Sequence, residues 1–189
     1  MYAKDKTMKK RTILIAAAVV ASAACAAEFS PADVLVYTRW QYVKNKNTGE
    51  VAKSGTAPWA KAYHHLSTEQ GAEEVRRYFT ANGLKCLVTD APAVFASDAM
   101  KSFKAIMLCN CNHELFDTAE QREAFYSYVE NGGGLVVTHS ASACERGSER
   151  FRKFLGGSFE RHYKKHQSVP FSHADRSHPA IACMPDGYV

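Results

Sequence analysis

The sequence has little net charge outside its first eleven residues, and it lacks the patterns of common nucleic-acid-binding modules. The 189-residue chain carries a formal charge of +5, but five of its 24 basic residues and one of its 19 acidic residues lie in residues 1–11. The 19 basic and 18 acidic residues that remain nearly cancel, so they offer no electrostatic attraction to nucleic acid. Zinc-finger spacing, a P-loop and internal repeats are also absent. We therefore expect one domain and no nucleic-acid partner.

Long hydrophobic runs are scarce too, and the one at the N-terminus is typical of an export signal. The basic sequence KKR precedes the apolar run TILIAAAVVASAACAA. This run is too short and too rich in alanine to favour a stable membrane span, and small residues end it. We predict a signal peptide over residues 1–26, no stable membrane span after cleavage, and a periplasmic or secreted mature protein. A lipoprotein anchored at Cys25 is the alternative, although Ser22 occupies a position where lipoproteins favour leucine.

The sequence lacks the paired cysteines of a disulfide framework, and its cysteine pattern favours buried thiols. Five cysteines follow the predicted signal peptide, so at least one is not paired within the chain. Cys86 and Cys109 occur in apolar, strand-like segments, where a free thiol behaves as a small hydrophobe. Cys109 and Cys111 are two residues apart, so on a continuous strand they would face the same side. A soft-metal site at this pair remains an alternative.

Short apolar, β-prone segments alternate with helical patterns along the chain. These segments predict four strands, at residues 33–39, 85–90, 103–110 and 135–137. Strand–helix–strand alternation implies parallel strands joined by right-handed crossovers. The predicted fold is therefore α/β, with a doubly wound, mostly parallel sheet of the flavodoxin-like type.

Three helical patterns lie between and after these strands. The first covers residues 67–81 and ends before an Asn-Gly pair. Asp117 and Glu120 form the D-x-x-E pattern of a capping box, which predicts the start of a second helix. The third covers residues 148–155 and ends at two glycines. The predicted apolar face of the first helix consists of Ala72, Val75, Tyr78 and Phe79.

Two further segments complete the prediction. Residues 41–60 are polar and contain two glycines, so they predict a long loop of the kind that often forms a functional lid. The sequence SVPF at residues 168–171 is a candidate short strand.

Histidines cluster near the predicted carboxyl ends of the strands, where α/β sheets bind their ligands. The sequence GGGLVVTHSAS at residues 132–142 places His139 directly after the fourth strand. His113 follows the third strand, and His64 and His65 follow the first strand at a greater distance. Neutral imidazole can bind a metal ion such as zinc or transfer protons near neutral pH. We therefore predict a histidine-containing site at this edge.

Four segments, in order, resemble the ThuA-like family, which is named for trehalose utilisation. They are HHLST at residues 64–68, YVENGGGLVVTHSAS at 128–142, FLGGSFERH at 154–162 and DRSHPAI at 175–181. The resemblance implies a ThuA-like domain over residues 32–189 with a fold similar to class I glutamine amidotransferases. It also implies missing C-terminal strands, in either a truncated product or a shortened variant.

The resemblance implies roles for individual residues. His139 occupies the position at which amidotransferases carry their nucleophilic cysteine, and Cys144 comes five residues later, so glutamine hydrolysis is not expected. His139 and His65 are the predicted catalytic residues. The predicted substrate-binding residues are His162, His178 and Arg39; for Arg39 a surface salt bridge is the alternative.

Two functions remain open at this point. The first is an exported enzyme that acts on a small-molecule carbohydrate or an oxidised (keto) sugar, with a divalent metal ion as a candidate cofactor. The second is a non-catalytic sugar-binding module of the cell envelope. The sequence leaves the oligomeric state open.

Overall fold

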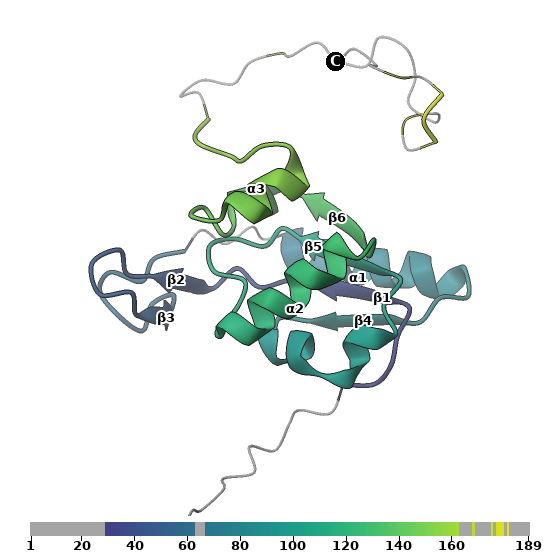
Figure 1. Cartoon of the computed structure of the whole chain (residues 1–189), viewed down its shortest axis with the longest axis horizontal. Helices are drawn as coiled ribbons and strands as arrows, with labels where there is room; N and C mark the ends of the chain where they lie inside the picture. The colour runs from purple at the N-terminus through teal and green to yellow at the C-terminus, as the bar shows by residue number, and fades with distance from the viewer. Residues whose placement is uncertain are drawn as a thin grey trace, which may run out of the picture.

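The four predicted strands form one parallel sheet at the centre of the computed structural model, which describes residues 29–62 and 67–162 and positions 168, 175, 177–179 and 181. The spatial order is β4-β1-β5-β6, and every neighbouring pair is parallel (Figure 1). The strands are β1 (Val34–Tyr37), β4 (Cys86–Thr89), β5 (Ala105–Cys109) and β6 (Gly134–Thr138). The predicted α/β fold with a mostly parallel sheet is thus confirmed.

Strand β1 is apolar throughout because both of its faces are covered. Its four residues are all buried. Leu35 and Tyr37 point into one hydrophobic cluster, and Val34 and Val36 point into another on the opposite face. Successive side chains of a strand alternate between faces, so a central strand of a covered sheet reads as a continuous hydrophobic run.

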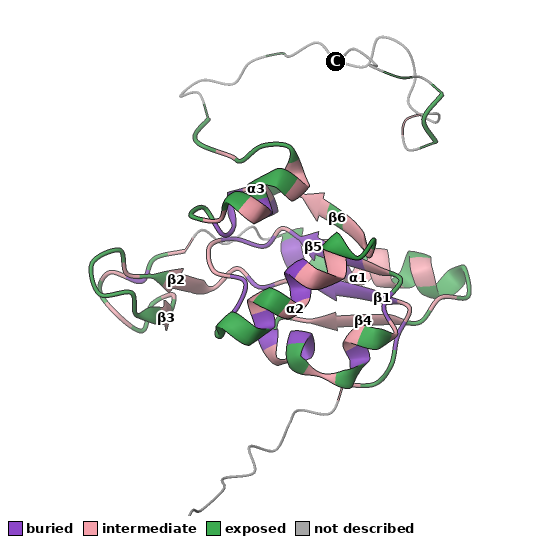
Figure 2. Cartoon of the chain, viewed as in Figure 1, coloured by how far each residue is buried: buried purple, intermediate pink, exposed green. Residues whose placement is uncertain are grey.

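Helices cover both faces of the sheet. Helix α1 (Ser67–Ala81) packs on the face of Val34 and Val36, whereas α2 (Ala119–Glu130) and α3 (Glu149–Leu155) contribute to the cluster on the other face (Figures 1 and 2). Two 3₁₀ segments, η1 (Pro92–Ala96) and η2 (Asp98–Lys101), join β4 to β5. Rings of Phe95, Phe116 and Phe125 pack at the centre of the second cluster, with centroids 5.1 to 5.6 Å apart.

The strand order creates a switch point between β1 and β5. From β1 the chain moves through α1 to β4, and then returns past β1 to β5. The connections that leave β1 and β5 therefore lead to helices on opposite faces of the sheet. A crevice outside the carboxyl ends of two such strands is the general ligand site of open α/β sheets.

The prediction of a loop over residues 41–60 is wrong, because this segment contains an antiparallel hairpin. Strand β2 (Tyr42–Lys44) pairs with β3 (Val51–Lys53), and Figure 1 shows that the hairpin projects from the sheet. The turn is stabilised by Asn45, whose Oδ1 accepts hydrogen bonds from the backbone of Asn47 and Thr48. Gly49 supplies a positive φ of 75°. Short β-prone segments on either side of this turn suffice to form the pair.

The capping box of α2 lies one residue later than predicted. Thr118 is the N-cap: its Oγ1 accepts a hydrogen bond from the backbone of Gln121, whose Oε1 in turn accepts from the backbone of Thr118. The Asp117–Glu120 assignment is therefore wrong. Threonine and glutamine satisfy the same reciprocal pattern, and Asp117 is engaged elsewhere.

The other helix predictions are largely confirmed. Helix α3 is capped by Ser148 and ends at Gly156, whose φ of 71° is left-handed. Helix α1 has the predicted extent, but Tyr78 is 67% exposed and does not belong to its buried face. The predicted signal peptide, and all but the first residue of the predicted strand at 168–171, lie outside the described residues. In the described part of the chain, no helix combines the length and the apolarity needed to cross a membrane.

Candidate functional site at the carboxyl edge of the sheet

Left-handed backbone conformations mark one edge of the sheet. Among the described residues, four that are not glycine have positive φ: Asn110 (50°), His113 (62°), His139 (50°) and Glu145 (45°). The first two follow β5 and the last two follow the neighbouring strand β6. Such conformations cost about 1–3 kcal/mol each, and they concentrate at functional sites. The loops after β5 and β6 are therefore the candidate site.

His139 lies at a sharp turn from strand to helix. Strand β6 ends at Thr138, His139 takes its positive φ, and the 3₁₀ segment η3 (His139–Ala143) follows at once. The Ser142 hydroxyl donates to the carbonyl of His139 at 2.9 Å and fixes this turn. A strained strand-to-helix turn is the backbone arrangement that presents the nucleophile in α/β hydrolases. In this chain the residue at such a turn is a histidine.

Hydrogen bonds join the turn after β6 to the loop after β5. The Ser140 hydroxyl donates to the carbonyl of Asn110 at 3.0 Å, and the Asn110 backbone donates to Thr138 Oγ1 at 3.2 Å. Farther along, the backbone of Glu145 donates to the carbonyl of His113 at 3.1 Å. The two loops therefore form one connected unit that includes all four left-handed residues.

His113 combines a fixed backbone with a ring nitrogen that has no hydrogen-bond partner. Its backbone N–H donates to Asn112 Oδ1 at 3.0 Å. Its Nε2 is buried, and no hydrogen-bond partner contacts it. Burial, and next the positive charge of Arg146, lower the pKa of His113 below its usual value of 6.5. The imidazole is therefore neutral near pH 7.

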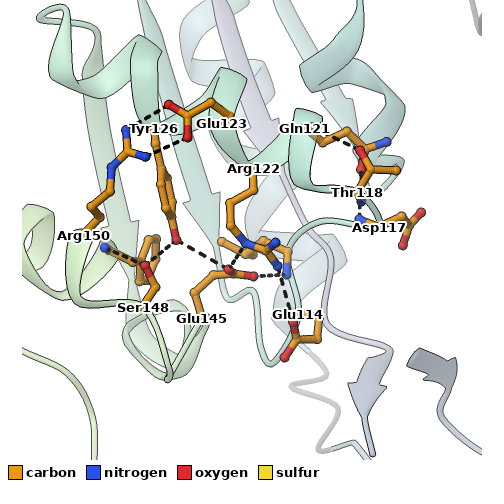
Figure 3. Close-up of polar contacts among 12 residues, drawn as sticks. Glu114, Asp117, Thr118, Gln121, Arg122, Glu123, Tyr126, Glu145, Ser148 and Arg150 are labelled. Carbon is orange, nitrogen blue, oxygen red and sulfur yellow. Dashed lines mark hydrogen bonds and ion pairs between the residues drawn. The ribbon is translucent and has the colours of Figure 1, made fainter. Parts of the chain in front are cut away.

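Glu145 fastens this unit to α2 (Figure 3). Its side chain is 3% exposed and forms an ion pair with Arg122, whose Nε lies 2.7 Å from Oε2. Oε1 accepts a hydrogen bond from the backbone of Leu115 at 3.2 Å. Arg122 also reaches Glu114 at 3.8 Å, and burial followed by the nearby charge of Glu145 raises the pKa of Glu114. Through these contacts the Glu145 carboxylate links the loop after β6 to α2 and to the segment that leads into α2.

Helices α2 and α3 are joined beside this network (Figure 3). The Tyr126 hydroxyl donates to Ser148 Oγ at 2.7 Å, so a residue of α2 contacts the N-cap of α3. Arg150 of α3 forms ion pairs with Glu123 and Glu130 of α2 at 2.7 and 2.6 Å. The loop that carries Glu145 is thus held between two packed helices.

Arg39, a predicted substrate-binding residue, is buried at the end of β1. Its side chain is 2% exposed, whereas that of its ion-pair partner Asp117 is 50% exposed. Arg39 Nε donates to the carbonyl of Glu114 at 3.1 Å, and the guanidinium lies 3.6 Å from the centroid of the Tyr42 ring. Arg39 therefore links β1 to the β2–β3 hairpin and to the segment that leads into α2. Its predicted contact with substrate remains a prediction.

The histidines predicted for the site lie in different surroundings in the structure. His139 lies at the carboxyl edge, as described above. His162 and His178 are exposed; the ring of His162 lies 5.5 Å from that of Phe159, and the backbone of His178 donates to the carbonyl of Asp175 at 3.3 Å. His65 lies outside the described residues. Their predicted roles in the site remain predictions.

The described cysteines are free thiols, and three of the four are buried. Cys144 is 1% exposed, and burial raises the pKa of its thiol well above the usual value. Cys109 and Cys111 belong to hydrophobic clusters on opposite faces, so the expectation that they face the same side is wrong. The left-handed conformation of Asn110 between them breaks the alternation of the strand. Among the described residues, no three histidine, cysteine or acidic side chains gather as metal ligands.

An apolar groove lies elsewhere on the molecule, and its chemistry does not suit a sugar. It is lined by residues of α1 and by strand residues, among them Phe79, Met107 and Val136. Glu74 is the charged residue in its lining. A sugar requires several hydrogen-bonding groups, which the loops after β5 and β6 provide and this groove does not.

The sequence did not predict that Glu145 belongs to the site formed by the loops after β5 and β6. It also did not predict the left-handed conformations in these loops. The polar sequence NCNHE directly after β5 was an available signal, because polar residues at the end of a buried strand favour a site. The bond between Glu145 and Arg122 joins residues 23 positions apart and leaves no local pattern in the sequence.

Comparison with known proteins identifies the family of the chain. The family model for ThuA, described as trehalose utilisation, matches residues 57–189. No match was found among curated proteins or among solved structures. The matched segment includes β4, β5, β6 and the strained turn at His139. The chain therefore belongs to the ThuA family of trehalose utilisation, a class I glutamine amidotransferase-like family.

Proposed function

We propose that this chain is an exported carbohydrate-active enzyme that acts on a sugar or an oxidised (keto) sugar at the edge formed by the loops after β5 and β6. The family is linked to trehalose or sugar utilisation, which supports the substrate class. In the proposal, His139 and His65 transfer protons or bind a divalent metal ion, and His162, His178 and Arg39 contact the sugar.

The observation that carries the proposal is the left-handed backbone of His139 at the end of β6. A positive φ costs free energy at a non-glycine residue, and function is a common reason for retaining it. Imidazole suits general acid–base chemistry because its pKa lies near the working pH. The buried Cys144 thiol, by contrast, is a poor nucleophile because burial raises its pKa.

A non-catalytic sugar-binding module is the second candidate. It is supported by the histidine at position 139, because amidotransferases carry their nucleophilic cysteine at the corresponding position. Both candidates require sugar to bind at the same edge, so turnover separates them.

The test is a panel of sugars that includes trehalose and a 3-keto glucoside, assayed with and without added Zn²⁺. An enzyme should convert at least one sugar, and His139→Ala should lower kcat/KM by about a hundredfold to ten-thousandfold. His65→Ala should also lower it, whereas Cys144→Ala should retain activity. If Cys144→Ala abolished turnover and His139→Ala retained it, a thiol mechanism would replace the proposal. Saturable binding without turnover would select the binding module.

Export is tested separately by the intact mass of protein recovered from the cell envelope. If the chain is cleaved near residue 26, the measured mass should lack the predicted signal peptide. A lipid adduct on Cys25 would select the lipoprotein alternative, and a mass that retains the apolar run would contradict export by cleavage.

A further inference from the structure

Strand β6 lies at one end of the sheet and has an open outer side. Its inner side pairs with β5, and among the described residues no strand pairs with its outer side. The Gly134 N–H donates to the Lys104 carbonyl, so Gly134 directs its backbone groups toward β5. Because successive residues of a strand direct these groups to opposite sides, Leu135 and Val137 direct theirs outward. In the described part of the chain no group hydrogen-bonds to them there.

The features with which natural proteins protect an edge strand are missing from β6. Such strands commonly carry lysine, proline or a bulge, which prevent pairing with another chain. The sequence of β6 is GLVVT, and it pairs with β5 in a continuous register without a bulge. Val136 at its centre is 49% exposed. In β4, the strand at the other end of the sheet, every residue is at least partly covered. The edge at β6 is therefore the one suited to pairing with a further strand.

Apolar side chains without charge surround this edge. Val136 lines the apolar groove described above together with Met107 of β5 and Tyr78 of α1. Three large hydrophobic residues are exposed in the described part of the chain, and two of them, Tyr78 and Val136, lie at this groove. Strand β6 itself carries no charged residue. Two copies of it can therefore lie side by side without repulsion between like charges.

We propose that β6 pairs antiparallel with β6 of a second copy of this chain, about a two-fold axis at Val136. In this register Leu135 lies opposite Val137 of the second copy, so each outward N–H meets an outward carbonyl. The two Val136 residues form a non-hydrogen-bonded pair, in which the Cα atoms lie about 4.5 Å apart and the side chains touch. The two four-stranded sheets then form one continuous sheet.

A second copy fits this edge because the edge is complementary to itself. Its donors and acceptors are arranged symmetrically about Val136, and a two-fold interface uses the same surface on both partners and closes as a dimer. Gly134 lies opposite Thr138 of the second copy, and its lack of a side chain leaves room at that end. The same register brings the glycine turn of the second copy next to His139. The dimer would therefore border the candidate site with backbone from its partner.

Val136→Lys tests the pairing, with Val51→Lys as the matched control. The first variant places two like charges opposite each other at the axis, so it should raise the dissociation constant of the dimer about tenfold or more. Its circular dichroism spectrum should match that of the wild type, because Val136 is half exposed. Val51 is 37% exposed and lies on the β2–β3 hairpin, so its replacement should leave the dimer intact. Sedimentation of the full chain at micromolar concentration measures all three proteins.

Val136→Cys tests the position of the axis. Only a two-fold axis at this residue brings the two introduced thiols within the range of a disulfide, whose Cα atoms are usually about 4.4–6.8 Å apart. Copper phenanthroline, which oxidises two thiols to a disulfide, should therefore convert this variant to a covalent dimer. Tyr78→Cys is the control, because Tyr78 is exposed at the same groove but lies off the axis. Wild-type protein gives the background from the native cysteines.

The outcomes decide the inference without reference to a sugar, so they are independent of the proposed function. A wild-type dimer that Val136→Lys dissociates and Val51→Lys preserves is the expected result. A wild-type monomer would overturn the inference, and slow hydrogen exchange of the Leu135 and Val137 amides in that monomer would indicate that another part of the same chain occupies the edge. A dimer that survives Val136→Lys, or equal cross-linking at residues 78 and 136, would overturn it as well.

Discussion

Replacing Arg39 with methionine should destabilise the protein far more than removing a comparable exposed arginine. Methionine keeps an apolar stem but removes every guanidinium contact. The bond to the Glu114 carbonyl is worth about 1.5 kcal/mol or more. The contact with the Tyr42 ring adds about 1–2 kcal/mol because the group is desolvated, and the half-exposed ion pair with Asp117 adds about 1 kcal/mol or less. Since methionine retains part of the buried packing, we expect a loss of about 3 kcal/mol.

The matched control is Arg150→Met. Arg150 forms two ion pairs, with Glu123 and Glu130, but its side chain is 40% exposed. Solvent screening reduces such pairs to about 1 kcal/mol or less. Urea unfolding followed by circular dichroism measures both variants. If Arg39→Met lost no more unfolding free energy than Arg150→Met, the reasoning from burial would be refuted. Weaker sugar binding by folded Arg39→Met would support the predicted role of Arg39 in substrate binding.

Three further perturbations test other parts of the structure. Gly133→Ala should lower the free energy of unfolding, measured in urea, by about 1–3 kcal/mol, because the added Cβ would overlap the Tyr128 ring. Gly147→Ala should lower it little, because Gly147 faces open space. Equal stability of the two variants would contradict this packing. Cys144 should resist iodoacetamide in the folded protein at pH 8 and react after unfolding, as peptide mapping would show; rapid reaction in the folded state would refute its burial. The pKa of His113 is lowered in the folded state, so the unfolded chain binds a proton more readily. As pH drops below about 6.5, the free energy of unfolding of the wild type should therefore fall more than that of His113→Asn. Parallel pH profiles of the two proteins would count against the lowered pKa.

Much of the fold could be predicted because it depends on local patterns. The run at residues 33–39 is apolar since β1 is covered on both faces, and the Gly-Gly sequence after residue 155 provides the left-handed end of α3. The hairpin over residues 42–53 was harder to predict than the central strands, because its strands are short and none of their residues is buried. The capping box was shifted by one residue because two overlapping pairs fit the same pattern.

The site could be predicted only in part. The position of His139 follows from the strand and the glycines before it. The conformations of Asn110, His113 and Glu145 depend on bonds between loops that are distant in the sequence, so no local pattern reveals them. The burial of Arg39 likewise depends on Tyr42 and Glu114, which only the folded chain brings together.

The most direct test of a sugar site at His139 is a titration of the ¹⁵N-labelled protein with a 3-keto glucoside, followed residue by residue by NMR. The account predicts that the largest shifts fall on residues 110–113 and 138–145, at the ends of β5 and β6, and that His139→Ala diminishes them. The amides of Met107 and Val136, which line the apolar groove, should change little. Saturable shifts confined to the groove, or shifts at the carboxyl edge that His139→Ala leaves unchanged, would contradict a sugar site centred on His139.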